Sequence, residues 1–384
     1  MRSLCEKIKP FLAMQILGKA TELARQGHDI IHLEVGQPDF PTPECVKEAA
    51  QKAIRDNISG YTPGNGILPL REAVAEYYAS EYNVSVSPER IVITQGSSPG
   101  LMMLLQAMCE PGDTVITPGP TYACYDSMIN FAGASSIRVP AKEENGFQLD
   151  PDMTRKMLLP STKLIMINSP SNPGGTLISR ADLQKLAELG PMLLSDEIYH
   201  GLVYEGKAVS ALEITSNCLI ADGFSKRYAM TGWRLGWIVL PGDPGENKNL
   251  AGTVASMQQN FFVCAAAATQ VAGIAALKHA SQDIKRMAAE YNRRRMVMVD
   301  GLTRLGFGIK SSPAGAFYIL ANAGHLSGDS LALALDILDK AHVGVTPGVD
   351  FGPEAEGYLR FCYANSVENI EKALSRIKKY LENR

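Results

Sequence analysis

The chain has 384 residues, of which 46% are hydrophobic and 20% are charged, and its formal net charge is -3. A chain of this length is too long for one compact core of ordinary size, so a large domain with a smaller one is expected. The small negative charge gives no reason to expect a nucleic acid or an anionic membrane as a partner.

The cysteines and histidines exclude two further classes of site. Seven cysteines, from Cys5 to Cys362, are scattered along the chain, and none forms a CxxC pair. This distribution favours a reducing compartment, the cytoplasm, and predicts no structural disulfides. The six histidines show no metal-ligand spacing, so no bound metal is expected.

Two apolar segments could be mistaken for targeting or membrane elements. Residues 11–17 are mostly apolar, but Lys9, Gln15 and Lys19 interrupt or flank them and no small-residue cleavage site follows. This segment is therefore predicted to be an amphipathic helix. Residues 261–277 are the longest weakly polar run, too short for a bilayer span, and are predicted to form a buried helix.

Alternating apolar and helical segments predict the fold class. Seven short apolar runs are predicted as strands, and most are separated by helical segments such as residues 99–109 and 180–189. This pattern indicates an α/β fold with a mixed, mostly parallel seven-stranded sheet between helices. The last two runs have no helical pattern between them, so the final strand is predicted to be antiparallel. The runs are residues 91–94, 114–117, 136–139, 164–168, 192–195, 218–221 and 235–240.

The segments before and after this region predict a smaller α+β domain. We expect an N-terminal arm of residues 1–42 that belongs to the small domain, a large domain of residues 43–280 and a C-terminal small domain of residues 281–384. The predicted elements outside the sheet are strands 30–35, 315–320, 344–345 and 358–363, and helices 43–54, 69–82, 282–305, 330–341 and one from 367.

Lys226 lies alone in the polar connector between the last two apolar runs. On the order of one in a few thousand unperturbed lysines is uncharged at neutral pH, so a nucleophilic lysine requires surroundings that lower its pKa. Arg227 and Arg234 bring positive charge that would lower it. On this segment alone, a solvated surface lysine is the alternative interpretation.

An anion site is predicted where residues 91–94 lead into a glycine- and serine-containing turn and then a helix. Free N-H groups and the helix dipole both favour a phosphate there, whereas a serine-capped helix without a ligand is the alternative. The same residues spell G-x-S-x-G, with Ser98 at the position of a hydrolase nucleophile. Pro99 lacks the N-H that would stabilise an oxyanion, which argues against a serine hydrolase.

Two polar residues are predicted at strand ends. Asn172 could donate a hydrogen bond to a ring oxygen, or it could belong to an ordinary Asn-Pro turn. Asp196 ends an apolar run and is either a helix cap or a functional charge. A carboxylate about 4 Å from a pyridine nitrogen contributes roughly 4 kcal/mol at an effective dielectric constant of about 20. This corresponds to about three pKa units, enough to keep such a nitrogen protonated.

Seven segments in register resemble the class I/II aminotransferases of fold type I, which use pyridoxal 5'-phosphate. The resemblance extends over nearly the whole chain and implies that fold and that cofactor. The segments are LEVGQPDF, YTPGNG, SPSNPGGT, SDEIYHGLVY, GFSKRYAMTGWRLGW, TPGVDFG and LRFCYANS.

The resemblance implies roles for individual residues around the coenzyme ring. Lys226 corresponds to the lysine that holds the cofactor covalently and later moves a proton. Asp196 corresponds to the partner of the pyridine nitrogen, and Tyr122 to the aromatic residue that stacks on the ring. Tyr199 and Asn172 correspond to the pair that hydrogen-bonds the phenolic oxygen of the ring.

The resemblance also implies roles in binding phosphate, substrate and a second subunit. Arg360 matches the arginine that binds the α-carboxylate of the substrate, and Gly36 lies in the loop that closes over it. Tyr61 resembles a residue that reaches the phosphate of the neighbouring subunit, which implies a homodimer. The residues that match the phosphate site are Gly96, Ser97, Ser98, Ser225 and Arg234.

The implied activity is transfer of the α-amino group of an L-amino acid to a 2-oxo acid, either 2-oxoglutarate or pyruvate, by a ping-pong mechanism. Some bacterial aspartate-using relatives carry a lysine where this chain has Ser98, and the apolar residues 11–17 could instead face a neutral side chain. A carbon-sulfur β-lyase would use the same cofactor apparatus. A non-catalytic cofactor-binding sensor is a further alternative, but the roughly 30 residues before the first strand show no helix-turn-helix pattern.

Overall fold

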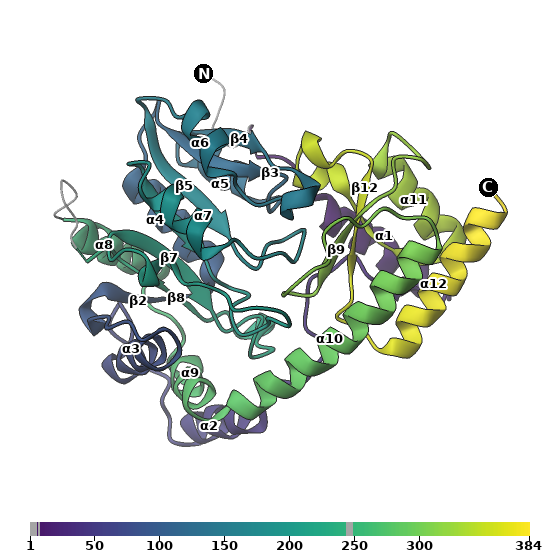
Figure 1. The fold of residues 1–384 in the computed structure, drawn as a ribbon. Helices are drawn as coiled ribbons and strands as arrows, with labels where there is room; N and C mark the ends of the chain where they lie inside the picture. Colours follow the sequence, from purple (N-terminus) through teal and green to yellow (C-terminus); the bar gives the residue numbers. More distant parts are fainter. Residues whose placement is uncertain (1–5, 7, 243–248) are drawn as a thin grey trace.

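A computed structural model describes residues 6, 8–242 and 249–384, so Cys5 lies outside the described residues (Figure 1). Its larger unit contains a seven-stranded sheet in the order β2-β8-β7-β6-β5-β3-β4. Strand β8 pairs antiparallel with β2 and β7, and the other pairings are parallel. The predicted mixed sheet and its antiparallel last strand are confirmed. The strands are β2 (Ile91–Thr94), β3 (Thr114–Gly119), β4 (Ser135–Pro140), β5 (Thr162–Asn168), β6 (Met192–Asp196), β7 (Cys218–Gly223) and β8 (Gly236–Val239).

Helices cover both faces of this sheet because its strands are apolar on both sides. In β2, Ile91 and Ile93 pack into one hydrophobic cluster and Val92 into another, as expected from the alternation of side chains along a strand. Helices α3 (Leu68–Tyr82) and α9 (Ala267–His279) contribute to the first cluster, and α4 (Ser97–Met108) and α8 (Leu250–Phe262) to the second. The remaining helices of this unit are α2 (Glu44–Arg55), α5 (Tyr125–Phe131), α6 (Pro151–Met157) and α7 (Arg180–Ala187).

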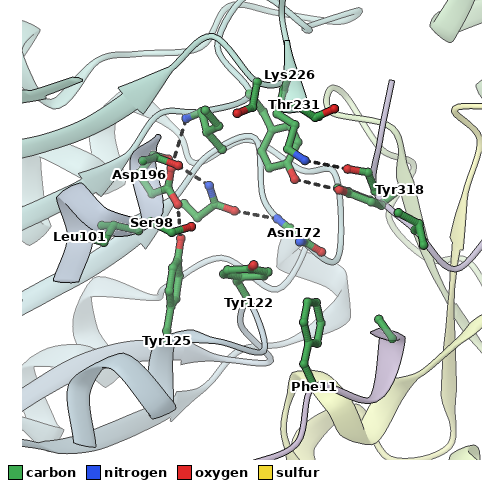
Figure 2. A pocket seen from close by; sticks show the side chains of 18 of the residues that line it. Phe11, Ser98, Leu101, Tyr122, Tyr125, Asn172, Asp196, Lys226, Thr231 and Tyr318 are labelled. Atoms are coloured by element: carbon green, nitrogen blue, oxygen red, sulfur yellow. Dashed lines mark hydrogen bonds between the residues drawn. The ribbon is translucent and has the colours of Figure 1, made fainter. Parts of the chain in front are cut away.

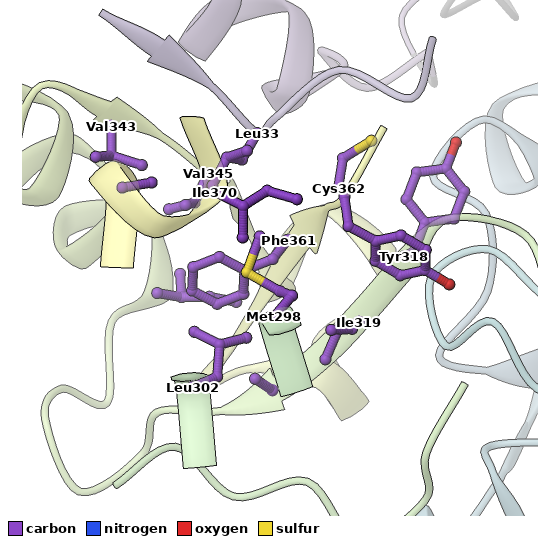
Figure 3. Close-up of a cluster of buried hydrophobic side chains, with 14 of the residues drawn as sticks. Leu33, Met298, Leu302, Tyr318, Ile319, Val343, Val345, Phe361, Cys362 and Ile370 are labelled. Atoms are coloured by element: carbon purple, nitrogen blue, oxygen red, sulfur yellow. The ribbon is translucent and has the colours of Figure 1, made fainter. Parts of the chain in front are cut away.

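The smaller unit joins both ends of the chain. Leu33 near the N-terminus packs into the same hydrophobic cluster as Met298 and Phe361 (Figure 3). An antiparallel sheet has the order β11-β12-β9, and β1 pairs parallel with β10. The elements are β1 (Ile31–His32), β9 (Tyr318–Asn322), β10 (Val343–Gly344), β11 (Thr346–Pro347), β12 (Tyr358–Cys362), α1 (Leu12–Arg25), α10 (Ser281–Arg304), α11 (Ser330–Ala341) and α12 (Val367–Glu382).

The prediction of one buried helix over residues 261–277 is wrong. Helix α8 ends at Phe262 and α9 begins at Ala267, and Val263 between them has a positive φ of 64°. Phe261 and Val263 are 68% and 48% exposed. An alanine-rich apolar run gives no periodicity from which such a break could be predicted.

Three predicted strands differ in extent from the observed ones. The strand expected at 30–35 shortens to β1, and the one expected at 344–345 is replaced by β10 and β11, on either side of Val345. The strand expected at 315–320 begins only at Tyr318, because Ala316 has a φ of 56° that interrupts the extended chain.

Candidate active site

A cavity of about 250 Å³ lies at the carboxyl ends of β5, β6 and β7, and residues of α1 and β12 also line it (Figure 2). This edge of a mostly parallel sheet is where ligands of α/β proteins bind. The carboxyl ends place Asn168 and Asp196 at the cavity, and the turn after β7 adds Lys226.

Asp196 is the buried anion of the cavity, with only 5% of its surface exposed. Tyr125 Oη donates a hydrogen bond to Asp196 Oδ2 at 2.6 Å, and the backbone N-H of Ile198 donates to Oδ1 at 3.2 Å. Burial raises the pKa of Asp196 to about 6, although these two donors and the Lys226 charge lower it. Its hydrogen-bond donors are neutral groups, so the carboxylate can accept a cationic ligand beside it.

Lys226 lies across the cavity from this carboxylate, and its Nζ donates to the backbone oxygen of Gly36 at 2.6 Å. Desolvation by the surrounding protein lowers the pKa of Lys226 to about 8, and the charges of Arg360 and Arg234 lower it further against the opposing effects of Cys362 and Asp196. About one in ten such lysines is uncharged at neutral pH, far more than in solution. Arg227, expected from the sequence to help lower this pKa, is instead paired with Asp222.

The start of α4 forms an anion cradle. Gly96 precedes the helix and supplies no side-chain cap, so the first N-H groups have no partner within the helix. Gly96 has a φ of +110°, which favours glycine, and a Cβ atom there would lie 2.6 Å from Arg234 Nη2, so the guanidinium lies close to the helix start. Ser97, Ser98 and Ser225 line the same region. The cradle has the donors and the positive charge that a phosphate requires.

Arg360 on β12 is a second cationic group of the cavity that could bind an anion. Its guanidinium is 2% exposed and donates to Asn172 Oδ1 and Thr346 Oγ1, both at 3.0 Å, and to the backbone oxygen of Glu34. An arginine has five donors, and the buried Nε has no partner in the structure. Arg360 lines the cavity, and its charge fits a carboxylate, which arginine binds through charge-assisted hydrogen bonds.

Aromatic side chains complete the wall of the cavity. Tyr199 Oη and Tyr318 Oη share a hydrogen bond of 2.8 Å, and the Arg360 guanidinium lies 4.5 Å from the Tyr318 ring centroid. Phe11 and Tyr122 contact each other edge to face, with ring centroids 6.1 Å apart, and are labelled side by side in Figure 2. The cavity thus combines a reactive lysine and a buried carboxylate with two anion sites and an apolar wall.

The sequence pattern of the family described as Aminotransferase class I and II matches residues 28–377. The chain belongs to this family. The aminotransferase is 39% identical to the aspartate/prephenate aminotransferase of Thermus thermophilus, and the match covers 99% of each chain. It is 38% identical to the (5-formylfuran-3-yl)methyl phosphate transaminase of Methanocaldococcus jannaschii, with 97% of this chain and 96% of that protein covered.

Solved structures share the fold of the aminotransferase. The aspartate aminotransferase from Thermus thermophilus with maleate superposes with a TM-score of 0.92 at 37% identity, covering 99% of this chain and 100% of that one. An aminotransferase from Mycobacterium tuberculosis superposes with a TM-score of 0.93 at 32% identity, covering all of both chains. The predicted fold type I architecture is confirmed.

The structure brings most of the predicted site residues of the aminotransferase together. Gly96 borders the cavity through its contact with Arg234. Tyr61 does not line the cavity and is 89% exposed. The predicted residues that line it are Gly36, Ser97, Ser98, Tyr122, Asn172, Asp196, Tyr199, Ser225, Lys226, Arg234 and Arg360.

Sequence reasoning missed Tyr125, Asn168 and Tyr318. Asn168 Nδ2 donates to the backbone oxygen of Asp196 at 2.9 Å, and its Oδ1 accepts from the N-H of Asn172 at 2.7 Å, so it connects two predicted site residues. Its position at the end of an apolar run was a usable signal, as it was for Asp196. Tyr318 lies within a predicted strand, where an aromatic residue gives no indication of function.

Proposed function

We propose that this aminotransferase binds pyridoxal 5'-phosphate in the cavity and moves the α-amino group of an L-amino acid to 2-oxoglutarate or pyruvate in two half-reactions. The observation that carries the proposal is the placement of Lys226 and Asp196 in one cavity with two anion sites. The coenzyme contains a phosphate, a ring nitrogen and an aldehyde, and the residues present fit each of these groups. The Gly96 cradle supports the phosphate assignment, because a larger side chain at this positive φ would be strained and Arg234 would have to move.

The residues assigned to the coenzyme follow from these contacts. Arg234, Ser225 and the start of α4 would bind the phosphate, and Asp196 would pair with the protonated ring nitrogen. Tyr199 and Asn172 would donate hydrogen bonds to the ring oxygen, with Tyr122 against the ring face. When bound, the coenzyme supplies an electron-withdrawing ring that makes the substrate Cα proton acidic.

The chain's own residues then move the proton and hold the substrate. Arg360 binds the α-carboxylate and fixes the orientation of the Cα-H bond. Lys226 removes the Cα proton and delivers it again, and a pKa near neutrality suits a group that must do both. The backbone oxygen of Gly36 accepts a hydrogen bond from Nζ and keeps it at the cavity wall.

We propose an amino donor with an uncharged, mostly apolar side chain. Phe11, Met14 and Leu101 line the cavity together with Tyr122. Lys226, Arg234 and Arg360 are the cationic side chains of the described lining, and each already has an assigned role. Asp350 accepts hydrogen bonds from the N-H groups of Leu12 at 2.9 Å and Ala13 at 3.1 Å, which holds the start of α1 beside the cavity.

A panel of amino donors with 2-oxoglutarate and with pyruvate tests both proposals. We expect kcat/KM for phenylalanine or leucine to exceed that for aspartate at least tenfold, because an unpaired side-chain carboxylate would have to be buried. A preference for aspartate would refute the substrate proposal alone. Release of ammonia and pyruvate without an acceptor would indicate β-elimination instead of transfer.

We also propose a homodimer in which Tyr61 reaches the phosphate of the neighbouring active site. Tyr61 is highly exposed. The N-H of the next residue, Thr62, donates to Cys264 Sγ at 3.5 Å, so the segment that carries Tyr61 lies near the exposed Phe261 and Val263. Exposed apolar clusters of this kind are typical of interaction surfaces. Light scattering of the purified protein measures the oligomeric state, and a monomer at all concentrations would refute this arrangement.

Two further predictions remain proposals. Residues 1–42 and 281–384 are proposed to form one domain and residues 43–280 another, which is supported by the common cluster of Leu33, Met298 and Phe361. A cytoplasmic location is supported by the described cysteines, which are all free. No helix of the described ranges is both long and apolar enough to cross a membrane. Residues 6, 8–242 and 249–384 also contain no cluster of His, Cys, Asp and Glu that could hold a metal.

A further inference from the structure

Arg227, the residue after Lys226, is a buried charge that does not line the cavity. Its side chain packs against α3 and is 1% exposed. Nη2 forms an ion pair with Asp222, which is 0% exposed, and Nη1 donates a hydrogen bond to Tyr77 Oη. The polar partners of this guanidinium therefore lie on β7, which carries Asp222, and on α3, which carries Tyr77.

Three aromatic rings enclose the same guanidinium. Its carbon lies 4.8 Å from the ring centroid of Tyr77, 5.7 Å from Trp237 and 5.8 Å from Tyr228. An arginine side chain can pack against aromatic rings and form an ion pair with a carboxylate at the same time, which lysine cannot reproduce. The position of Arg227 is thus fixed from several directions.

The turn that carries Lys226 is anchored by the buried side chains of Phe224, Tyr228 and Met230 and by Thr42 Oγ1, which donates to the Ala229 backbone oxygen at 2.7 Å. Residues 224–230 contain no helix or strand, and their internal backbone hydrogen bonds are long: Ala229 N to Lys226 O is 3.3 Å and Met230 N to Ser225 O is 3.2 Å. Asp222 Oδ1 accepts from the N-H of Gly223 at 2.6 Å, so the same carboxylate holds the beginning of the turn. The side chain of Arg227 connects this turn to β7 and α3.

We propose that Arg227 and Asp222 are positioning residues that hold the main chain of Lys226 so that its Nζ reaches the aldehyde carbon of the bound coenzyme. This inference rests on the proposed function. In the step concerned, the uncharged Nζ attacks the aldehyde carbon, a C=N bond replaces the C=O bond, and one water molecule leaves. Displacement of the main chain by even 1 Å slows reactions of this kind strongly.

The test compares two ligands that differ only in this step. Pyridoxamine 5'-phosphate has the same ring and phosphate as pyridoxal 5'-phosphate, but its amine cannot react with Lys226. Dissociation constants for both are measured on full-length protein freed of coenzyme, by absorbance and fluorescence titration. For Arg227→Met we expect at least tenfold weaker binding of the aldehyde form, with less than a twofold change for the amine form. Asp222→Asn is expected to act in the same direction.

Arg295→Met is the matched control. Arg295 on α10 is also a buried arginine, 5% exposed, paired with Glu205 and 5.8 Å from the Tyr204 ring centroid. It lies outside the Lys226 turn, so its substitution should leave the ratio of the two dissociation constants unchanged. If Arg227 contributed only to folding, the ratio of the two dissociation constants would be unchanged in Arg227→Met as well as in Arg295→Met.

Each outcome decides the inference. An unchanged ratio in folded Arg227→Met, or an equal change in Arg295→Met, overturns it while the proposed function stands. Failure of the wild type to bind either ligand overturns the proposed function and this inference together. If Arg227→Met does not fold, Tyr77→Phe removes one hydroxyl group, which accepts from Arg227 Nη1 and hydrogen-bonds Tyr82 Oη, and the ratio must then rise at least threefold.

Discussion

Asp196 and Asp222 end neighbouring strands, and burial raises the pKa of each to about 6. Their surroundings differ in one respect. Asp222 has a permanent ion pair with Arg227, whereas the hydrogen-bond donors to Asp196 are Tyr125 Oη and the Ile198 N-H. A buried carboxylate without its own cation costs stability. Asp222 therefore has a cationic partner within the protein, whereas Asp196 has only neutral hydrogen-bond donors among the described residues and is proposed to pair with a ligand.

The largest effect is expected when Arg227, the ion-pair partner of Asp222, is removed. Arg227→Met leaves Asp222 buried and unpaired, and should lower the free energy of unfolding by about 3 to 5 kcal/mol. Urea denaturation followed by circular dichroism measures this. The double variant Asp222→Asn with Arg227→Met should regain most of the loss, because no buried charge remains. A single variant as stable as the wild type would show that the pair does not stabilise the fold.

The converse variant is Asp196→Asn, which keeps the shape and removes the charge. It should lower kcat/KM by roughly 10³-fold, since about 4 kcal/mol of attraction to a ring nitrogen is lost. Stability of the coenzyme-free protein should not fall. Full activity in this variant would contradict the assignment of Asp196, and a large loss of stability would contradict its contrast with Asp222.

The pH dependence of stability tests the raised pKa of Asp196. Between the ordinary aspartate pKa of 3.8 and about 6, folded Asp196 keeps a proton that the unfolded chain has released. The coenzyme-free protein should therefore lose stability as the pH rises through this window, by up to about 3 kcal/mol from this residue. Thermal unfolding of the wild type and Asp196→Asn at a series of pH values measures the difference. Parallel curves would show that the carboxyl group has no raised pKa.

Arg360 extends the comparison to cations, because it lines the cavity and has no ion pair within the described part of the chain, whereas Arg227 lies outside the cavity lining and is paired with Asp222. Arg360→Lys keeps the charge but loses the paired geometry, so KM for the amino donor should rise about 10- to 100-fold. Steady-state kinetics measure this, with binding of pyridoxamine 5'-phosphate as the control that should hardly change. An unchanged KM would place the substrate carboxylate elsewhere.

The sequence was sufficient to predict the elements of the site that lie at strand ends. The apolar runs predicted the sheet; Asp196 directly follows one run, and Asn172 and Lys226 lie in the polar connectors after two others. The Asp222–Arg227 pair was not recognised because it depends on the shape of the turn between the two residues, and Tyr125 because its partner is set by how strands and helices pack in space. Tyr125 is 71 residues from Asp196 in the chain, and no local pattern reports such a contact. The break at Val263 was missed for a different reason, namely a backbone conformation that an apolar composition does not reveal.

The central claim is that Lys226 is the residue that reacts with the coenzyme. Purified protein is incubated with pyridoxal 5'-phosphate, reduced with borohydride, digested and analysed by mass spectrometry. The account predicts one stoichiometric coenzyme adduct, on the peptide that contains Lys226, and none in Lys226→Ala. An adduct on another lysine, such as the surface residue Lys278, with Lys226 unmodified would contradict it.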